Sequence, residues 1–155
     1  MTRTVLGLVA SIACLALGLL GATEKPPQMN LTLLQGRFSV CRLPPQAAVP
    51  EWASLKGTFG SITRTSDELS IVCAESIVPE GVKQESGWRV LKIEGPLDFG
   101  LTGILVSVVD PLNKVGISIL AVSTFDTDYV MVKDQKVEKA LKVLKAAGHT
   151  VAINR

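Results

Sequence analysis

The second half of the chain alternates between strand-like and helix-like hydrophobic patterns. Residues 88–94 (WRVLKIE) alternate apolar and polar side chains, which is typical of a half-buried strand. In residues 101–115 the apolar positions recur at the spacing of one helix face. Further elements are expected as strands at 117–123 and 128–132, a helix at 135–147 and a strand at 150–153. This order predicts an α+β fold, the split βαβ pattern of a ferredoxin-like sandwich.

Local signals predict where the two helices begin and end. Pro111 lies inside the first helical pattern, so we expect a kink there or a second short helix capped by Asp110. Gly116 and Gly148 follow the helical patterns as C-terminal cap glycines. Asp134 is the expected N-cap of the second helix.

The first half of the chain has weaker signals. It reads as short strands at 31–34, 38–43, 58–64 and 68–74, with one helical turn at 51–55. The segment 79–87, rich in Pro, Gly and Glu, is the best internal boundary. We therefore expect three parts: an apolar N-terminal extension and linker at 1–28, a reduced unit at 29–80 and a complete unit at 86–155.

The N-terminal segment Val5–Leu20 is apolar apart from one serine and follows Arg3. This layout is that of a secretory signal peptide, and the run is short for a membrane span. The alternative is an upstream extension that is not normally made, with Met29 as the natural start. The first interpretation predicts a protein exported or anchored through residues 4–22, and the second predicts a cytoplasmic 29–155 body.

Composition narrows the class of protein. The chain has 155 residues, 47% hydrophobic and 19% charged, which predicts a packed core rather than disorder. The net charge is +2 and no dense basic patch is present, so nucleic acid is not an expected partner.

The sequence offers few reactive groups. The single histidine and the three cysteines lack zinc-site spacing, and no nucleophile stands near a base in a recognisable motif, so neither metal, cofactor nor catalysis is expected. Cys41 and Cys73 are interpreted as small buried residues in strands, and a disulfide between them is considered only for an exported chain. His149 is expected at the surface or at the helix cap.

Two carboxylates stand in the polar link between the strands expected at 117–123 and 128–132. Aspartate favours turns, so turn chemistry is one interpretation of Asp126 and Asp128. The other applies best to Asp128, which starts a strand at the sheet rim and can meet an ammonium group there. An Asp-x-Asp metal site is not expected, because that chemistry needs a larger nucleotide-binding domain.

The glycine-rich segment 95–103 (GPLDFGLTG) leads into the first predicted helix. Its amides, together with the helix dipole, suit a carboxylate or a phosphate. The alternative is a tight connection whose glycines let the helix pack closely. This loop and the exit of the strand at 117–123 are expected at opposite ends of the sheet, so a pocket shared between them is expected where two units meet.

Three stretches resemble the CASTOR-type ACT domain family: residues 59–75, the long string 87–132 and the helix end 146–149. The resemblance implies two tandem ACT-like βαββαβ units, the first of them reduced. It also implies a non-catalytic regulatory or sensor protein that holds a free amino acid at an ACT–ACT interface and self-associates through its sheets. Animal relatives in the family sense arginine, which makes arginine the first candidate. A ligand-independent dimerisation module is the alternative function.

The resemblance also implies the ligand-binding residues. They come from the loop before the long helix and from the segment between two strands: Phe99, Gly100, Leu101, Thr102, Gly103 and Ile104, with Thr124, Phe125 and Asp128. In this hypothesis Asp128 contacts an ammonium or guanidinium group, and the amides of residues 100–103 hold the carboxylate of the ligand.

Overall fold

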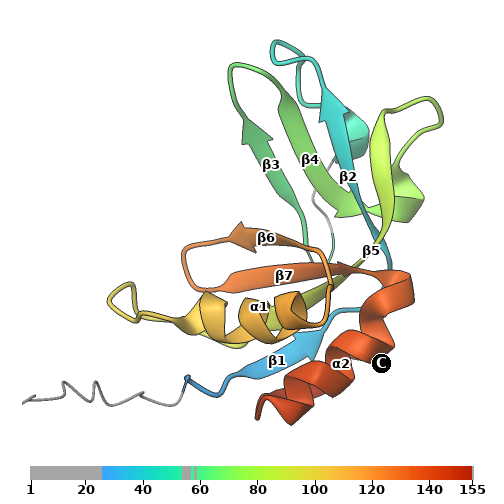
Figure 1. Ribbon diagram of the computed structural model, residues 1–155. Helices are drawn as coiled ribbons and strands as arrows, with labels where there is room; N and C mark the ends of the chain where they lie inside the picture. Colours follow the sequence, from blue (N-terminus) through green and yellow to red (C-terminus); the bar gives the residue numbers. More distant parts are fainter. Residues whose placement is uncertain (1–25, 54–56, 58, 155) are drawn as a thin grey trace, which may run out of the picture.

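The computed structural model describes residues 26–53, 57 and 59–154, so the apolar segment 5–20 lies outside the described residues. Figure 1 shows the arrangement of the elements. The strands are β1 (Asn30–Leu33), β2 (Phe38–Leu43), β3 (Ser61–Arg64), β4 (Leu69–Ala74), β5 (Gln84–Ile93), β6 (Ile119–Ser123), β7 (Asp128–Lys133) and β8 (Thr150–Ile153). The helices are α1 (Ile104–Lys114) and α2 (Val137–Ala146), with short 3-10 turns at Glu51–Ala53, Glu75–Ile77 and Asp134–Lys136. None of the described helices is long and apolar enough to cross a membrane.

Strand β5 is the common member of two groups of strands (Figure 1). Its first half pairs with β2, through partners such as Phe38 and Trp88, and β2 continues into β4 and β3. Its second half pairs with β1, where Leu31 lies opposite Ile93, and with β7, where Met131 lies opposite Val90. The strand therefore joins a small antiparallel sheet to a larger sheet in the order β8-β1-β5-β7-β6.

The order β5-α1-β6-β7-α2-β8 is the predicted ferredoxin-like α+β pattern, which is confirmed. The position of β1 was not predicted. This strand lies between β5 and β8, antiparallel to the first and parallel to the second. The three-part division of the chain stays a prediction, and the placement of β1 means that residues 30–33 belong to the sheet of the C-terminal unit.

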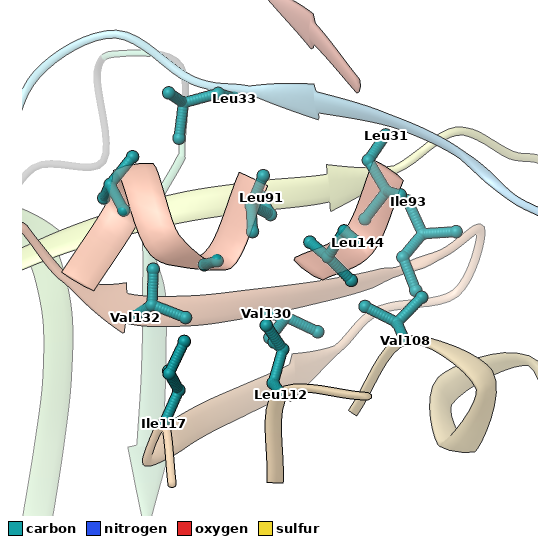
Figure 2. Close-up of a cluster of buried hydrophobic side chains, with 12 residues drawn as sticks. Leu31, Leu33, Leu91, Ile93, Val108, Leu112, Ile117, Val130, Val132 and Leu144 are labelled. Carbon is teal, nitrogen blue, oxygen red and sulfur yellow. The ribbon is translucent and has the colours of Figure 1, made fainter. Parts of the chain in front are cut away.

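Helices α1 and α2 cover one face of the larger sheet, and the main core lies between the helices and this face. Figure 2 shows this cluster, which consists of Leu31, Leu33, Leu91, Ile93, Val108, Leu112, Ile117, Val130, Val132, Val137, Ala140 and Leu144. Alternate residues of β5 and β7, Val90 and Met131, point to the other face and pack with Leu34, Phe38 and Val72. Both faces of the central strands are therefore buried, which explains why β7 reads as a continuous apolar run.

Helix α1 is continuous through Pro111, so the alternative of a second short helix starting there is wrong. Proline lacks the N–H that would bond to the carbonyl of Ser107. His149 replaces that bond, because its Nε2 lies 2.9 Å from the Ser107 oxygen. Its Nδ1 accepts the Met29 N–H at 3.1 Å, so the hydrogen is assigned to Nε2. Of the two expected positions for His149, the surface is wrong, because the residue is only 5% exposed. The helix cap is confirmed, because its N–H donates to the Leu144 carbonyl at 3.0 Å.

The cap glycines are confirmed and the cap aspartate is not. Gly116 and Gly148 adopt positive φ angles of 72° and 98° after α1 and α2. Asp134 makes no side-chain cap hydrogen bond, and α2 begins at Val137, after a 3-10 turn. Its carboxylate is instead bound by Arg37 at 2.8 Å and by Arg89 at 3.3 Å. The Asp134 carboxylate, which the sequence pattern assigned to the helix end, therefore forms ion pairs with two arginines instead.

Cys41 and Cys73 are buried free thiols, each 1% exposed, as the interpretation of small core residues requires. They lie on neighbouring strands, β2 and β4, under the loops that cover the small sheet. Burial raises the pKa of Cys41 to about 11, and the neighbouring Cys73 thiol adds to the shift. The pKa of Cys73 is also raised by burial.

We expect His149→Ala to destabilise the protein by about 2 kcal/mol or more, because the buried Ser107 carbonyl and the partly buried Met29 N–H lose their partner. In a Pro111→Ala background, residue 111 has an N–H that can donate to the Ser107 oxygen. The same His149→Ala change should therefore cost about 1 kcal/mol less there. Urea unfolding of the four variants of this cycle measures the difference, and an equal cost in both backgrounds would contradict the account.

A second expectation concerns alkaline pH. In the unfolded chain a cysteine ionises near pH ~8.5, whereas folded Cys41 stays protonated up to a pKa of about 11. The stabilisation is complete below the unfolded pKa and is lost as pH rises between these values, by about 3 kcal/mol at most. The free energy of unfolding is measured from about pH 8 to about pH 11, which spans the two pKa values. It should fall less steeply with pH for Cys41→Ala than for the parent. Parallel curves would contradict the assignment.

Candidate functional site

The loop after β5 is fastened to the turn between β6 and β7. The N–H of Leu97 donates to the carbonyl oxygen of Asp126 at 2.8 Å. A Cβ on Gly95 would lie 2.6 Å from that same oxygen and 3.2 Å from the Cβ of Thr127. Only a glycine at position 95 therefore lets the loop approach the turn this closely.

Two threonines hold the turn in shape. Both the N–H and the hydroxyl of Thr124 donate to the Thr127 carbonyl, at 2.9 and 2.7 Å. The hydroxyl of Thr127 donates to the carbonyl of Ile93 at the end of β5, and Thr127 is 5% exposed. The turn is thus preorganised against β5, and this places the start of β7 beside the loop.

The loop and the turn line one cavity of about 230 Å³ within a single chain. The expectation that they lie at opposite ends of the sheet is wrong. Strands β5 and β6 are each antiparallel to β7. They therefore run parallel to each other, and α1 connects them as a crossover, so their C-terminal ends reach the same edge.

Eleven residues line this cavity: Leu97, Asp98, Phe99, Leu101, Ile104, Ser123, Thr124, Phe125, Asp126, Thr127 and Asp128. Six of the nine residues named from the sequence are among them: Phe99, Leu101, Ile104, Thr124, Phe125 and Asp128. Gly100, Thr102 and Gly103 belong to the same loop but do not line the cavity. Asp98 was missed, although the pattern Asp98-Phe-Gly100 is a turn signal that can be read from the sequence.

The amides of the loop divide into two groups. The Gly100 N–H donates to Oδ1 of Asp98 at 2.7 Å, and the Leu101 N–H donates to the Asp98 carbonyl at 3.0 Å. No acceptor for the amides of Thr102 and Gly103 is found within the described residues. Half of the predicted carboxylate cradle is therefore occupied by Asp98, and the other half leads directly into the first turn of α1, which begins at Ile104.

The rim of the cavity is apolar and exposed. The rings of Phe99 and Phe125 are 77% and 79% exposed, and they meet edge to face with centroids 5.2 Å apart. Leu101 adds exposed apolar area on the loop, at 54%. Exposed apolar groups gathered around a cavity mark a binding surface more often than chance.

The charges of the lining have one sign. Asp98, Asp126 and Asp128 are the charged members, and no Lys, Arg or His lines the cavity. A neighbouring cavity of about 390 Å³ shares the turn and contains Lys92. Lys92 is 3.1 Å from Glu94, whose pKa is lowered by the Thr32 hydroxyl and then by Lys92. Across the described part of the chain, no group of three potential ligands is placed to hold a metal ion.

Two family models match the chain. The ACT domain model matches residues 83–146, and a model of an N-terminal domain matches residues 36–81. The cytosolic arginine sensor for mTORC1 subunit 1 from Pongo abelii is 30% identical over 132 residues, which cover 79% of this chain and 40% of that protein. The human protein of the same name is 29% identical over the same shares. The chain thus spans about 40% of the length of these curated relatives.

Solved structures show the same architecture. A protein from Agobacterium tumefaciens is 43% identical with a TM-score of 0.79, over 83% of this chain and 96% of that chain. An aspartate kinase from Clostridium acetobutylicum, described as an allosteric enzyme, has a TM-score of 0.54 at 16% identity, over 73% of this chain and 33% of that chain. At that identity the kinase supports the fold alone.

The close approach of loop and turn makes a testable prediction. Gly95→Ala should destabilise the protein by about 2 kcal/mol or more, because its Cβ meets the backbone of the turn. Gly81→Ala is the matched control, because a Cβ there meets nothing within 4 Å and only its φ of +84° is unfavourable. That control should cost about 1 kcal/mol. Urea unfolding compares the two, and a Gly95→Ala variant no less stable than the control would contradict the proposed contact.

Proposed function

Because the chain belongs to the CASTOR-type ACT domain family, we propose that it is a non-catalytic regulatory protein that binds a free amino acid in the cavity between residues 97–104 and 123–128. One observation carries the proposal: a helix start and Asp128 line the same cavity. An amino acid has a carboxylate and an ammonium group, and these two features suit the two charges.

The ligand is oriented by the groups that remain free. Its carboxylate lies against the first turn of α1, which reaches the cavity through Ile104 and where the helix dipole favours negative charge. Its cationic groups face Asp128 and the other two carboxylates of the lining, Asp98 and Asp126. Three carboxylates without a lining base favour a ligand with a second positive charge, so arginine is the first candidate.

A second ACT unit completes the site. The cavity is open, and its rim carries the exposed rings of Phe99 and Phe125. Among the described strands, β6 pairs only with β7, so its outer edge is free beside the cavity. We take a second copy of the chain as the second unit, because it would bring the same outer edge of β6 and the same exposed rim. The ligand then lies at an ACT–ACT interface.

The alternative function is a structural module that dimerises without a ligand. The exposed side chains of Phe99, Leu101 and Phe125 favour it, because the same apolar surface can be buried by a partner alone. The two functions differ in whether amino-acid binding is coupled to dimerisation or to thermal stability. A sensor dimerises or gains thermal stability with its amino acid, whereas a structural module does neither.

Two further features belong to the proposal. A catalytic role is disfavoured because both ring nitrogens of His149 are used in structural contacts, to Met29 and to Ser107. The 29–155 body is assigned to the cytoplasm, in line with the relatives that are named cytosolic.

Calorimetric titration of the full chain with free amino acids tests the proposed function. We expect arginine to bind and Asp128→Ala to weaken binding at least about tenfold, because a hydrogen-bonded charge pair is lost. Asp67→Ala is the matched control, because Asp67 is an exposed aspartate in the turn of the other hairpin, between β3 and β4. Absence of heat and of thermal shift for all twenty amino acids, or equal affinity of Asp128→Ala, would sink the assignment.

A further inference from the structure

Asp98 holds a fixed position in the loop of the candidate site. Its Oδ1 accepts the Gly100 N–H at 2.7 Å, while its carbonyl accepts the Leu101 N–H. A Cβ on Gly100 would lie only 3.0 Å from the same Oδ1. Glycine at position 100 therefore lets the carboxylate rest directly against the backbone, on a residue that also lines the cavity.

This contact changes what the loop offers to a ligand. The Gly100 amide is the kind of donor that would otherwise take a ligand carboxylate. With Asp98 bound to it, the amide is occupied and a negative charge stands in its place. An incoming carboxylate at this point meets repulsion, whereas an incoming cation meets attraction.

We propose that Asp98 sets the charge class of the ligand: it excludes a carboxylate from the Gly100 end of the loop and favours ligands with a cationic side chain. The inference rests on the proposed amino-acid site and adds a specificity-determining residue to it. Asp128 meets the cation from the turn side of the cavity and Asp98 meets it from the loop side. Both residues line the same cavity of about 230 Å³.

A purely structural role for Asp98 makes a different prediction. An aspartate that bonds to the N–H two residues later forms a common turn, and an asparagine oxygen does the same. Asp98→Asn therefore preserves the turn and removes only the charge. Asp98→Ala removes both. If Asp98 serves the turn alone, the Asn variant behaves as the parent does, and only the Ala variant changes.

The experiment compares arginine with citrulline, which has nearly the same size and shape but no charge on its side chain. Glutamate is included as an acidic ligand. Calorimetric titrations use the full chain of the parent, Asp98→Asn, Asp98→Ala and the control Asp67→Asn. We expect the parent to prefer arginine to citrulline by about tenfold or more, and Asp98→Asn to lower this preference about three- to tenfold while citrulline affinity changes less than about twofold. Glutamate should bind Asp98→Asn more tightly than it binds the parent.

Each outcome of these titrations supports or overturns the role of Asp98 or the proposed function. An unchanged arginine-to-citrulline ratio in Asp98→Asn overturns the role of Asp98, while amino-acid binding by the parent still supports the proposed function. A parent that binds arginine and citrulline equally also overturns the role of Asp98. A parent that binds no amino acid overturns both proposals. A ratio that falls in Asp98→Asn and Asp98→Ala alike, but not in Asp67→Asn, supports the inference.

Discussion

The contact between the loop after β5 and the turn before β7 is the constraint on which the site depends. The Asp126 carbonyl accepts the Leu97 N–H, and Gly95 leaves room for this approach by having no side chain. Thr127 ties the same turn to the end of β5. Without this fastening the start of α1 and the start of β7 would be two separate loop regions. With it, a helix dipole and a carboxylate face the same small volume.

The crossover topology explains why one chain is enough to bring these groups together. In a strand–helix–strand unit the two strands are parallel, so both end at the same edge of the sheet. The periodicity of residues 88–123 predicts the elements correctly, but relative strand direction depends on which strands pair. That information lies in long-range contacts between β5, β7 and β6. The expected fold was therefore right, while the expectation that the loop and the turn lie at opposite ends of the sheet was wrong.

Local patterns predicted elements well wherever a residue interacts with its own neighbours in sequence. The cap glycines at positions 116 and 148 are examples. Local patterns failed where a residue distant in sequence bonds to the group that the pattern assigns to a neighbour. Two arginines from other segments take the carboxylate of Asp134. A proline in α1 leaves a carbonyl that His149, 42 residues away, satisfies. Strand β1, between β5 and β8, is the same kind of case, because a strand of four residues with two leucines does not specify its neighbours in the sheet.

The chemistry of the cavity shows the same division. The resemblance to the family pointed to the loop and the turn that line the cavity, because those segments are recognisable as sequence strings. Asp98 escaped notice because an aspartate two residues before a glycine reads as a turn residue, and its role in the lining depends on the turn across the cavity. Asp98, Asp126 and Asp128 give the lining three carboxylates and no base. In the proposed function these carboxylates attract a cationic ligand, and a partner unit covers the exposed aromatic rim formed by Phe99 and Phe125. Ligand binding and closure of the rim would then favour each other, since each would be more favourable when the other has occurred.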